Sequence, residues 1–320
     1  MIPSKIKFLL IFLTLFLSIN YSAICQKNFT KEIGIISDND LYVTTFRDRY
    51  YTNGTFLYFR FLQCLSNTQG KKIHEIQIGQ QMYTPNKAQE SDIKKIDRPF
   101  AGYSFINYSQ LIFYENNAIL KATIEIGTTG PKSLAKESQN IIHDIYGFKK
   151  SEGWDNQIAN RFGIGIELRY TKSIFLKKKI DLHLESQIAA GTIFSNTNLR
   201  LISRFNLFNK KLNPNSNSIL FESNLNAKNS QTKNSKELFL FLSPSVNYAF
   251  YDATIQARLE NNNPMEYSLI PLTYSYEIGL KYAVKRFNLG YSIITYSKKV
   301  KKMIDDTNTY GSIKVAYKFN

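Results

Sequence analysis

Apolar and polar residues alternate with a period of two along many short segments of this chain. Residues 163–170 read Gly-Ile-Gly-Ile-Glu-Leu-Arg-Tyr, and residues 277–284 read Glu-Ile-Gly-Leu-Lys-Tyr-Ala-Val. The alternation recurs, less cleanly in places, at 56–62, 76–78, 182–184, 238–242, 287–293 and 313–319. Because successive side chains of a strand point to opposite faces, the pattern predicts about a dozen β-strands between residues 28 and 320.

One segment breaks this pattern. Between Ser133 and Gly147, the apolar residues at positions 141, 142, 145 and 146 recur at the spacing of one helical face. Ser133 is placed to cap the first turn, and Gly147 is placed to end the last one. The sequence therefore predicts a short helix over 133–147 in a loop of an otherwise all-β chain. This helix carries His143, one of three histidines.

The N-terminus has the features of a secretory signal. Lys5 and Lys7 precede an apolar run from residue 8 to 19, and Ala23-Ile24-Cys25 follows. This run is shorter than the roughly 20 residues that a spanning helix needs. We predict a signal peptide over 1–25 and one domain over 26–320. A lipoprotein modified at Cys25 is the alternative, although Ile24 stands where a small residue is expected. Cleavage would leave Cys64 as the only thiol, so no internal disulfide is expected.

Composition favours a membrane barrel over a soluble sandwich, whose strands also alternate. The chain has 21 Tyr and 23 Phe, and these residues favour strands and populate the interfacial girdles of outer-membrane barrels. It ends on a strand-like segment, 313–319, with aromatic residues at its last positions. The prediction is a transmembrane antiparallel β-barrel of about 12 strands, with a narrow lumen filled largely by side chains.

The formal net charge is +16, and it falls to +14 when Lys5 and Lys7 leave with the signal peptide. For an exported protein, the expected polyanion is the phosphorylated surface of lipopolysaccharide in the outer membrane, and not a nucleic acid. Alternatively, the lysine-rich loops only keep the protein soluble. The Asn-, Ser- and Lys-rich stretches 206–218 and 226–236 are predicted to be solvated loops.

Several polar clusters stand at predicted strand ends. Asp38-Asn39-Asp40 offers hard oxygen ligands that suit calcium, although the same composition is common in turns. The three histidines, at 74, 143 and 183, lack the spacing of a zinc site. The sequence lacks a Gly-x-Ser-x-Gly motif, the turn that presents a nucleophilic serine in many hydrolases. A mechanism through an acyl-serine intermediate therefore has no support.

Taken together and in order, these clusters resemble one family, the outer-membrane lipid A 3′-O-deacylases. The resemblance covers about residues 30 to 170 and rests on these motifs: Asp38-Asn39-Asp40, Arg49-Tyr50-Tyr51-Thr52-Asn53-Gly54, Gly79-Gln80-Gln81-Met82-Tyr83-Thr84-Pro85, Asp97-Arg98-Pro99-Phe100-Ala101-Gly102-Tyr103, Gly130-Pro131, Gln139-Asn140-Ile141-Ile142-His143 and Trp154-Asp155-Asn156-Gln157.

The resemblance implies a twelve-stranded barrel whose active site lies between the outer wall and a helix formed by an extracellular loop. It implies His143 as general base and a calcium ion, Ca²⁺, as oxyanion hole, similar to phospholipase A2. Asn39 and Asp40 match the family's Asn-Asp pair, and Asp40 would hold the ion. Thr52 matches a family threonine, and Gln139 matches a glutamine to which we assign a positioning role.

Two departures limit the match. The family has a basic residue after its Tyr-x-Pro motif, and Lys87 is the candidate here, with 94–95 as alternatives. A family glutamate after the histidine has no clear counterpart, so Asp144 or Asp155 would have to replace it. Separately from these departures, Arg98 is a candidate for a lumen salt bridge or for a contact with a lipid A phosphate.

The leading hypothesis is a calcium-dependent ester hydrolase of the bacterial outer membrane that releases the 3′-linked acyloxyacyl group of lipid A. Its active site would face the outer leaflet. An imidazole is suited to activate water there, because its ordinary pKa is about 6.5. No protein partner is implied. A non-catalytic barrel, either a narrow channel or a lipopolysaccharide-binding protein, and a phospholipase A are the alternatives.

Overall fold

The computed structural model describes residues 28–43, 49–63, 71–86, 90, 92–147, 152–208, 211–227, 236–260 and 267–320, except the side chains at 93, 145 and 146. The predicted signal peptide, the Cys64 thiol and Lys87 lie outside these residues. Among the helices of the described part, none is long and apolar enough to span a membrane.

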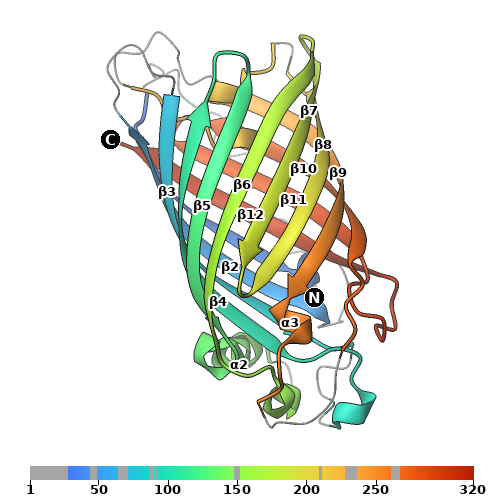
Figure 1. Ribbon diagram of the computed structural model, residues 1–320. Helices are drawn as coiled ribbons and strands as arrows, with labels where there is room; N and C mark the ends of the chain where they lie inside the picture. Colours follow the sequence, from blue (N-terminus) through green and yellow to red (C-terminus); the bar gives the residue numbers. More distant parts are fainter. Residues whose placement is uncertain are drawn as a thin grey trace, which may run out of the picture.

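In the described ranges, twelve antiparallel strands close into a barrel (Figure 1), in which each strand pairs with its neighbours in the sequence and β1 pairs with β12. The strands are β1 (Lys31–Asn39), β2 (Tyr50–Gln63), β3 (Lys71–Thr84), β4 (Ala101–Phe113), β5 (Ala118–Thr129), β6 (Arg161–Leu176), β7 (Ile180–Gly191), β8 (Phe194–Asn206), β9 (Glu237–Asp252), β10 (Leu272–Val284), β11 (Phe287–Ser297) and β12 (Thr307–Phe319). The predicted fold class and strand number are confirmed.

Short helices lie in the connections between strands. Within the described ranges, the α-helices are α2 (Ala135–Tyr146) and α3 (Ala253–Gln256). The 3-10 turns are η1 (Asp40–Tyr42), η2 (Ile93–Lys95), η3 (Pro131–Ser133), η4 (Glu152–Asn156), η5 (Asn215–Asn217) and η6 (Ile219–Phe221). The helix predicted over 133–147 is therefore present, two residues shorter at its start.

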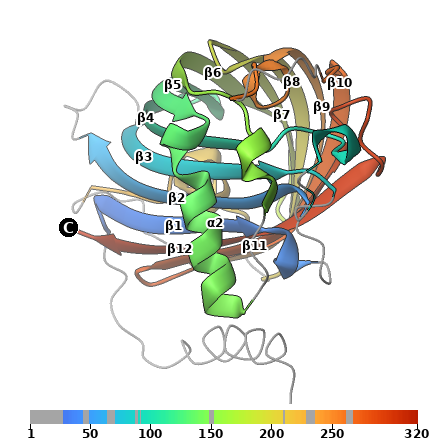
Figure 2. The ribbon, with the colours of Figure 1, turned by 90° about the horizontal axis from the view of Figure 1, so that it is seen from below.

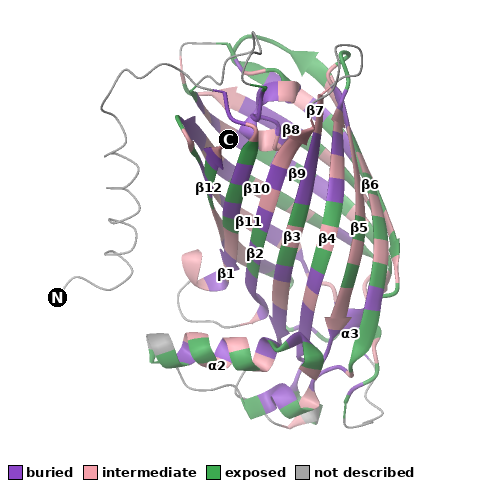
Figure 3. Ribbon diagram, turned by 90° about the vertical axis from the view of Figure 1, so that its left-hand side faces the viewer, coloured by how far each residue is buried: buried purple, intermediate pink, exposed green. Residues whose placement is uncertain are grey.

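The two faces of the wall differ as the alternation predicted. In β1, Glu32 and Asp38 are buried inside the barrel, while Ile33 and Ile35 are 53% and 41% exposed on the outside. In β6, the outward residues Ile164, Ile166 and Leu168 are at least half exposed. Figure 3 shows these alternating bands along the strands. An apolar outer face around a polar lumen is the arrangement of a membrane barrel.

The two ends of the barrel have different connections. We call the end that carries α2, at the bottom of Figure 1, the helix rim, and the opposite end, where β1 begins and β12 ends, the terminal rim. At the terminal rim, the backbone N–H of Thr30 donates to the carbonyl of Phe319. Most connections at the helix rim are long, whereas those at the terminal rim include the short turns 114–117, 177–179 and 285–286.

One prediction about the loops is wrong. In the polar stretch 206–218, Asn215, Asn217 and Ser218 are almost fully buried, and so is Asn226 at the start of the second stretch. These residues fold into the terminal end of the barrel, because the lumen is itself polar and accepts such side chains.

Candidate active site

Helix α2 packs against the outer wall of β3 and β4 at the helix rim. A Cβ added to Gly102 of β4 would lie 2.0 Å from Ser133 Oγ and 2.4 Å from Ala135 Cβ, so only glycine permits this close approach. The outward side chains of Gln80 and Ser104 both donate hydrogen bonds to the carbonyl of Ser133, at 2.6 and 2.7 Å. These contacts fix the start of α2 on the wall.

The ends of α2 differ from the prediction at one point. Leu134, in the left-handed region with φ 57°, precedes the helix, and it forms no side-chain cap. Ser133 instead donates from Oγ to the carbonyl of Gly130, so its predicted capping role is wrong. Gly147 ends the helix as predicted, with φ 72° and its N–H donating to the carbonyl of His143.

The buried face of α2 is polar. Ala135, Gln139 and His143, spaced four residues apart, are 1%, 3% and 5% exposed. Ile141, which we expected on the buried apolar face, is 61% exposed, so that expectation is wrong. Because residues at i, i+4 and i+8 lie on one side of a helix, α2 turns a glutamine and a histidine toward the protein.

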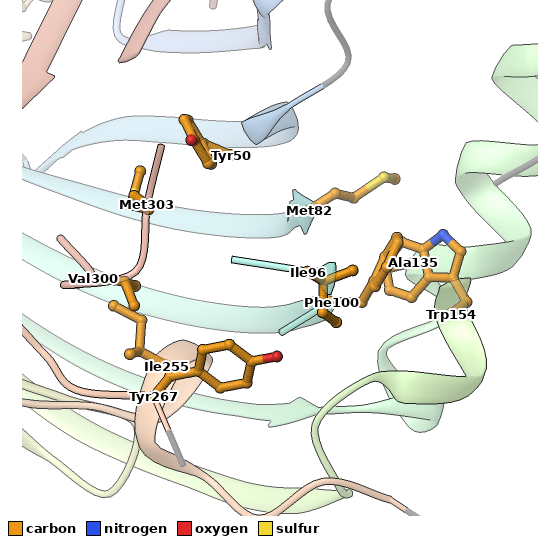
Figure 4. Close-up of a cluster of buried hydrophobic side chains, with 10 residues drawn as sticks. All are labelled: Tyr50, Met82, Ile96, Phe100, Ala135, Trp154, Ile255, Tyr267, Val300 and Met303. Carbon is orange, nitrogen blue, oxygen red and sulfur yellow. The ribbon is translucent and has the colours of Figure 1, made fainter. Parts of the chain in front are cut away.

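Trp154 of η4 holds this face in place. Its ring is fully buried, and Nε1–H donates to Gln139 Oε1 at 2.5 Å. Figure 4 shows Trp154 next to Phe100 and Ala135, with Met82 extending toward them. They belong to one buried cluster that also contains Tyr50, Ile96, Ile255, Tyr267, Val300 and Met303. This cluster joins four of the helix-rim connections, those between β3 and β4, β5 and β6, β9 and β10, and β11 and β12.

The end of β1 supplies the predicted acid and amide. Asn39 Oδ1 accepts the N–H of Leu41 at 2.7 Å and so caps η1, and Asp40, 3% exposed, accepts the N–H of Arg49 on Oδ2 at 3.1 Å. A Cβ at Gly311 of β12 would lie 2.6 Å from Tyr42 Cβ, so η1 folds over the outer face of the wall.

A β-bulge in β2 brings Thr52 to the same outer face. Tyr51 pairs with Tyr83 and Asn53 pairs with Met82, so Thr52 is the extra residue. Tyr51 points into the lumen, where its hydroxyl donates to Asp38, and Gly54 also faces inward. The two residues between them therefore both occupy outward positions. Thr52 donates from Oγ1 to the carbonyl of Met82 at 3.4 Å.

The length of α2 indicates where His143 lies relative to the ends of β1 and β2. In Figure 2, α2 runs across the view from β4 past β3, β2 and β1. Eight residues separate Ala135, which lies on β4, from His143, a rise of about 12 Å. Neighbouring strands are about 4.8 Å apart, so this rise corresponds to two to three strands. His143 is therefore expected near the ends of β2 and β1, where Thr52 and Asp40 stand.

The other predicted residues lie elsewhere. Arg98 is 2% exposed, its guanidinium donates to the carbonyl of Thr254, and it stacks on the Tyr83 ring at 4.7 Å. Lysines 94–95 are exposed on η2. Asp155, one of the substitutes for the family glutamate, is exposed and pairs with Lys136 at 3.0 Å. Contacts of these residues with lipid A stay a prediction.

The oxygen atoms at the end of β1 are of the chemical type that binds calcium. In the part of the chain that the structure describes, no three His, Cys, Asp or Glu side chains are grouped to hold a metal. Asp40 and Asn39 nevertheless offer a buried carboxylate and an amide oxygen, which are hard ligands of the type calcium prefers. An ion there would need backbone carbonyls and water as its other ligands.

Sequence reasoning missed the residues that dock α2. Gln80, Ser104 and Gly102 face outward from strands whose other outward residues, such as Ile78 and Ile106, are apolar. Polar side chains at outward positions of a membrane barrel were the available signal, because the outer face otherwise meets lipid. Nothing in the sequence indicated that Trp154 packs against this helix and donates a hydrogen bond to Gln139.

A search of curated proteins gave no match. Among solved structures, LpxR from Salmonella typhimurium superposes with a TM-score of 0.70 and 18% identity, covering 90% of this chain and 100% of that chain. The translocator domain of the autotransporter NalP from Neisseria meningitidis has a TM-score of 0.46 and 8% identity, covering 96% and 93%. The first likeness shows a shared barrel fold. The family model described as outer membrane protein LpxR matches residues 9–319, so the chain belongs to the LpxR family of outer membrane proteins.

Proposed function

We propose that this protein is an esterase of the outer membrane that removes the 3′-linked acyloxyacyl group of lipid A. The observation that carries the proposal is the buried side of α2, on which Gln139 and His143 are almost fully covered, with His143 expected from the helix length near the ends of β1 and β2. Membership of the LpxR family supports it, as does the resemblance to lipid A deacylases. The long connections at the helix rim favour placing this end outside the cell, where lipid A lies.

In the proposed mechanism, an imidazole nitrogen of His143 takes a proton from a water molecule, which attacks the ester carbonyl. The ring later returns the proton to the leaving alcohol. Gln139, held by Trp154, positions the helix face that carries His143. Asp40 and Asn39 would hold a calcium ion, which when bound supplies Lewis-acid stabilisation of the oxyanion. Thr52 stands beside them on the outer face.

The test is mass spectrometry of lipid A incubated with the purified protein in detergent. We expect loss of the 3′-linked chain with the wild type and with Glu137→Gln, a matched control on the exposed face of α2. Activity should disappear in His143→Ala and in Asp40→Ala, and it should be lost with a chelator and restored by calcium. Full activity in His143→Ala would refute the mechanism.

The same spectra separate the alternative enzymes. Release of fatty acids from glycerophospholipids, with lipid A left intact, would identify a phospholipase A and would overturn the assignment of the substrate.

A further inference from the structure

The connection between β8 and β9 enters the barrel at the terminal rim. We call its residues 211–227 the plug. Phe221 and Leu225 of the plug pack in one buried cluster with lumen-facing side chains of five strands, Leu62, Ile73, Leu111, Phe113, Ile119 and Ile202. Leu212 and Ile219 pack in another with Phe239, Phe241 and Ala283 of β9 and β10. The plug therefore contacts opposite sides of the wall and crosses the lumen.

Glu222 joins the plug to a buried charge cluster. Its carboxylate contacts Arg60 at 2.5 Å, Lys121 at 3.1 Å and Lys314 at 3.7 Å. Glu32 and Glu75 pair with the same cations from the wall. The cluster holds three cations and three carboxylates, and Glu222 is the one member that the plug contributes. Burial raises the pKa of Glu222, but Arg60, Lys121 and Lys314 outweigh it and hold that pKa well below its usual range.

Two further sites on the wall hold the plug. The carboxylate of Glu237 accepts hydrogen bonds from Ser218 Oγ at 2.8 Å and from the N–H of Ile219 at 2.9 Å. Lys71 Nζ donates to the carbonyl of Ser216 at 2.7 Å and to Asn226 Oδ1 at 3.0 Å. These bonds tie polar plug residues to fixed positions on β9 and β3, so the segment is an ordered part of the barrel.

Polar space lies behind the plug. One lumen cavity of about 360 Å³ is lined by Lys121, Glu125, Glu167 and also by Glu222, so the plug forms part of its boundary. A second, of about 330 Å³, lies nearer the helix rim and is lined by Asp38, Asn198 and Lys299. The buried atom Asn107 Oδ1 belongs to a residue that lines the first cavity, and it has no hydrogen-bond partner in the described protein. Cavities that are polar and this large hold water.

We propose that the plug seals a hydrated lumen at the terminal rim and that the ion pairs of Glu222 hold the plug in place. Breaking these ion pairs admits small hydrophilic solutes to the lumen. This lumen lies on the opposite face of the wall from α2, so the inference does not depend on the proposed esterase activity. It gives the barrel a second, separate property, a hydrated lumen that the chain itself closes at the terminal rim.

Cysteine accessibility in the full-length protein tests the proposal. Thr123→Cys places a thiol in the larger cavity, in a background where the native Cys25 and Cys64 are Ser. In detergent, a small charged maleimide should label this thiol at least tenfold faster when Glu222→Gln is added. Glu115→Gln, an exposed carboxylate at the same rim, is the matched control and should leave the rate unchanged.

A second pair of variants keeps the test decisive if Glu222→Gln folds poorly. Lys71→Met removes a different anchor and should also speed labelling. Asn224 and Asn288 exchange side-chain hydrogen bonds at 2.8 and 2.9 Å, which tie the plug to β11. Asn224→Ala removes this anchor and should likewise speed labelling. Equal labelling rates with and without Glu222→Gln and Lys71→Met, in barrels that stay folded on gels, would overturn the proposal.

Discussion

Substituting Gly102 by Ala tests whether α2 must lie tightly on the wall. The new Cβ would stand 2.4 Å from Ala135 Cβ, about 1.1 Å short of the ~3.5 Å at which two carbon atoms pack. Ala135 has no rotamer that relieves the clash, so the start of α2 must move outward by about that distance. Such overpacking costs about 1–3 kcal/mol and is confined to the helix.

Gly102→Ala should lower the deacylation rate more than it lowers the stability of the barrel. A displacement of about 1 Å can cost about 100-fold in rate, which corresponds to about 2.7 kcal/mol of activation free energy. We therefore expect Gly102→Ala to deacylate lipid A about 100-fold more slowly, while it still migrates as a folded barrel on gels without heating. Adding Ala135→Gly, which removes the clashing methyl group, should recover part of the rate.

Gly290→Ala is the control for a glycine in the wall. Its added Cβ would have Lys314 Cβ as nearest neighbour, at 3.5 Å, which is an ordinary contact. This variant should keep the wild-type rate. If Gly102→Ala is also as fast as the wild type, then α2 does not need its observed position, and the site argued from its buried face is wrong.

Three further predictions follow from single contacts. Trp154→Phe removes the hydrogen bond to Gln139, worth about 1 kcal/mol net, so deacylation should slow, and Trp154→Phe combined with Gln139→Leu should be no slower than Gln139→Leu alone. Thr52→Val, which keeps the shape and removes the hydroxyl, should slow deacylation without changing the unfolding midpoint by more than a few degrees. Glu222→Gln should lower the free energy of unfolding by about 3–5 kcal/mol at pH 7, measured with urea in lipid vesicles. Because the folded-state pKa of Glu222 lies below the ordinary 4.5, its contribution is complete above that pH and is lost as the pH falls through the lower value, so the two proteins should converge only in acid.

The strands and their number were predictable from the sequence because each strand separates two different solvents. Ile164, Ile166 and Leu168 face outward, and the residues between them face a polar interior. Apolar and polar residues therefore alternate with a period of two in the sequence itself. The helix was predictable for a different reason: a break in that period inside a long connection. Its buried face was not, since Gln139 and His143 look like surface residues in a one-dimensional pattern and only their docking shows otherwise.

The plug could not be recognised from composition. A solvated loop and a segment that fills a polar lumen have the same Asn- and Ser-rich sequence, because both are surrounded by hydrogen-bonding groups. What distinguishes the two is the set of wall partners, Arg60, Lys71 and Glu237, which lie more than a hundred residues away or on another strand. Such pairings depend on closure of the barrel and leave no local signal.

The bulge at Thr52 shows how one inserted residue can place the proposed active-site residues on the outer face of strands whose other polar side chains face the lumen. Without it, strict alternation from Tyr51, whose hydroxyl reaches Asp38 in the lumen, would turn Asn53 inward and leave only Thr52 outside. The extra residue places both on the outer face while the rest of β2 keeps its register with β1. Lumen substitutions such as Glu222→Gln should therefore leave deacylation unchanged, because the strands that carry both sites are rigid and present them on opposite sides.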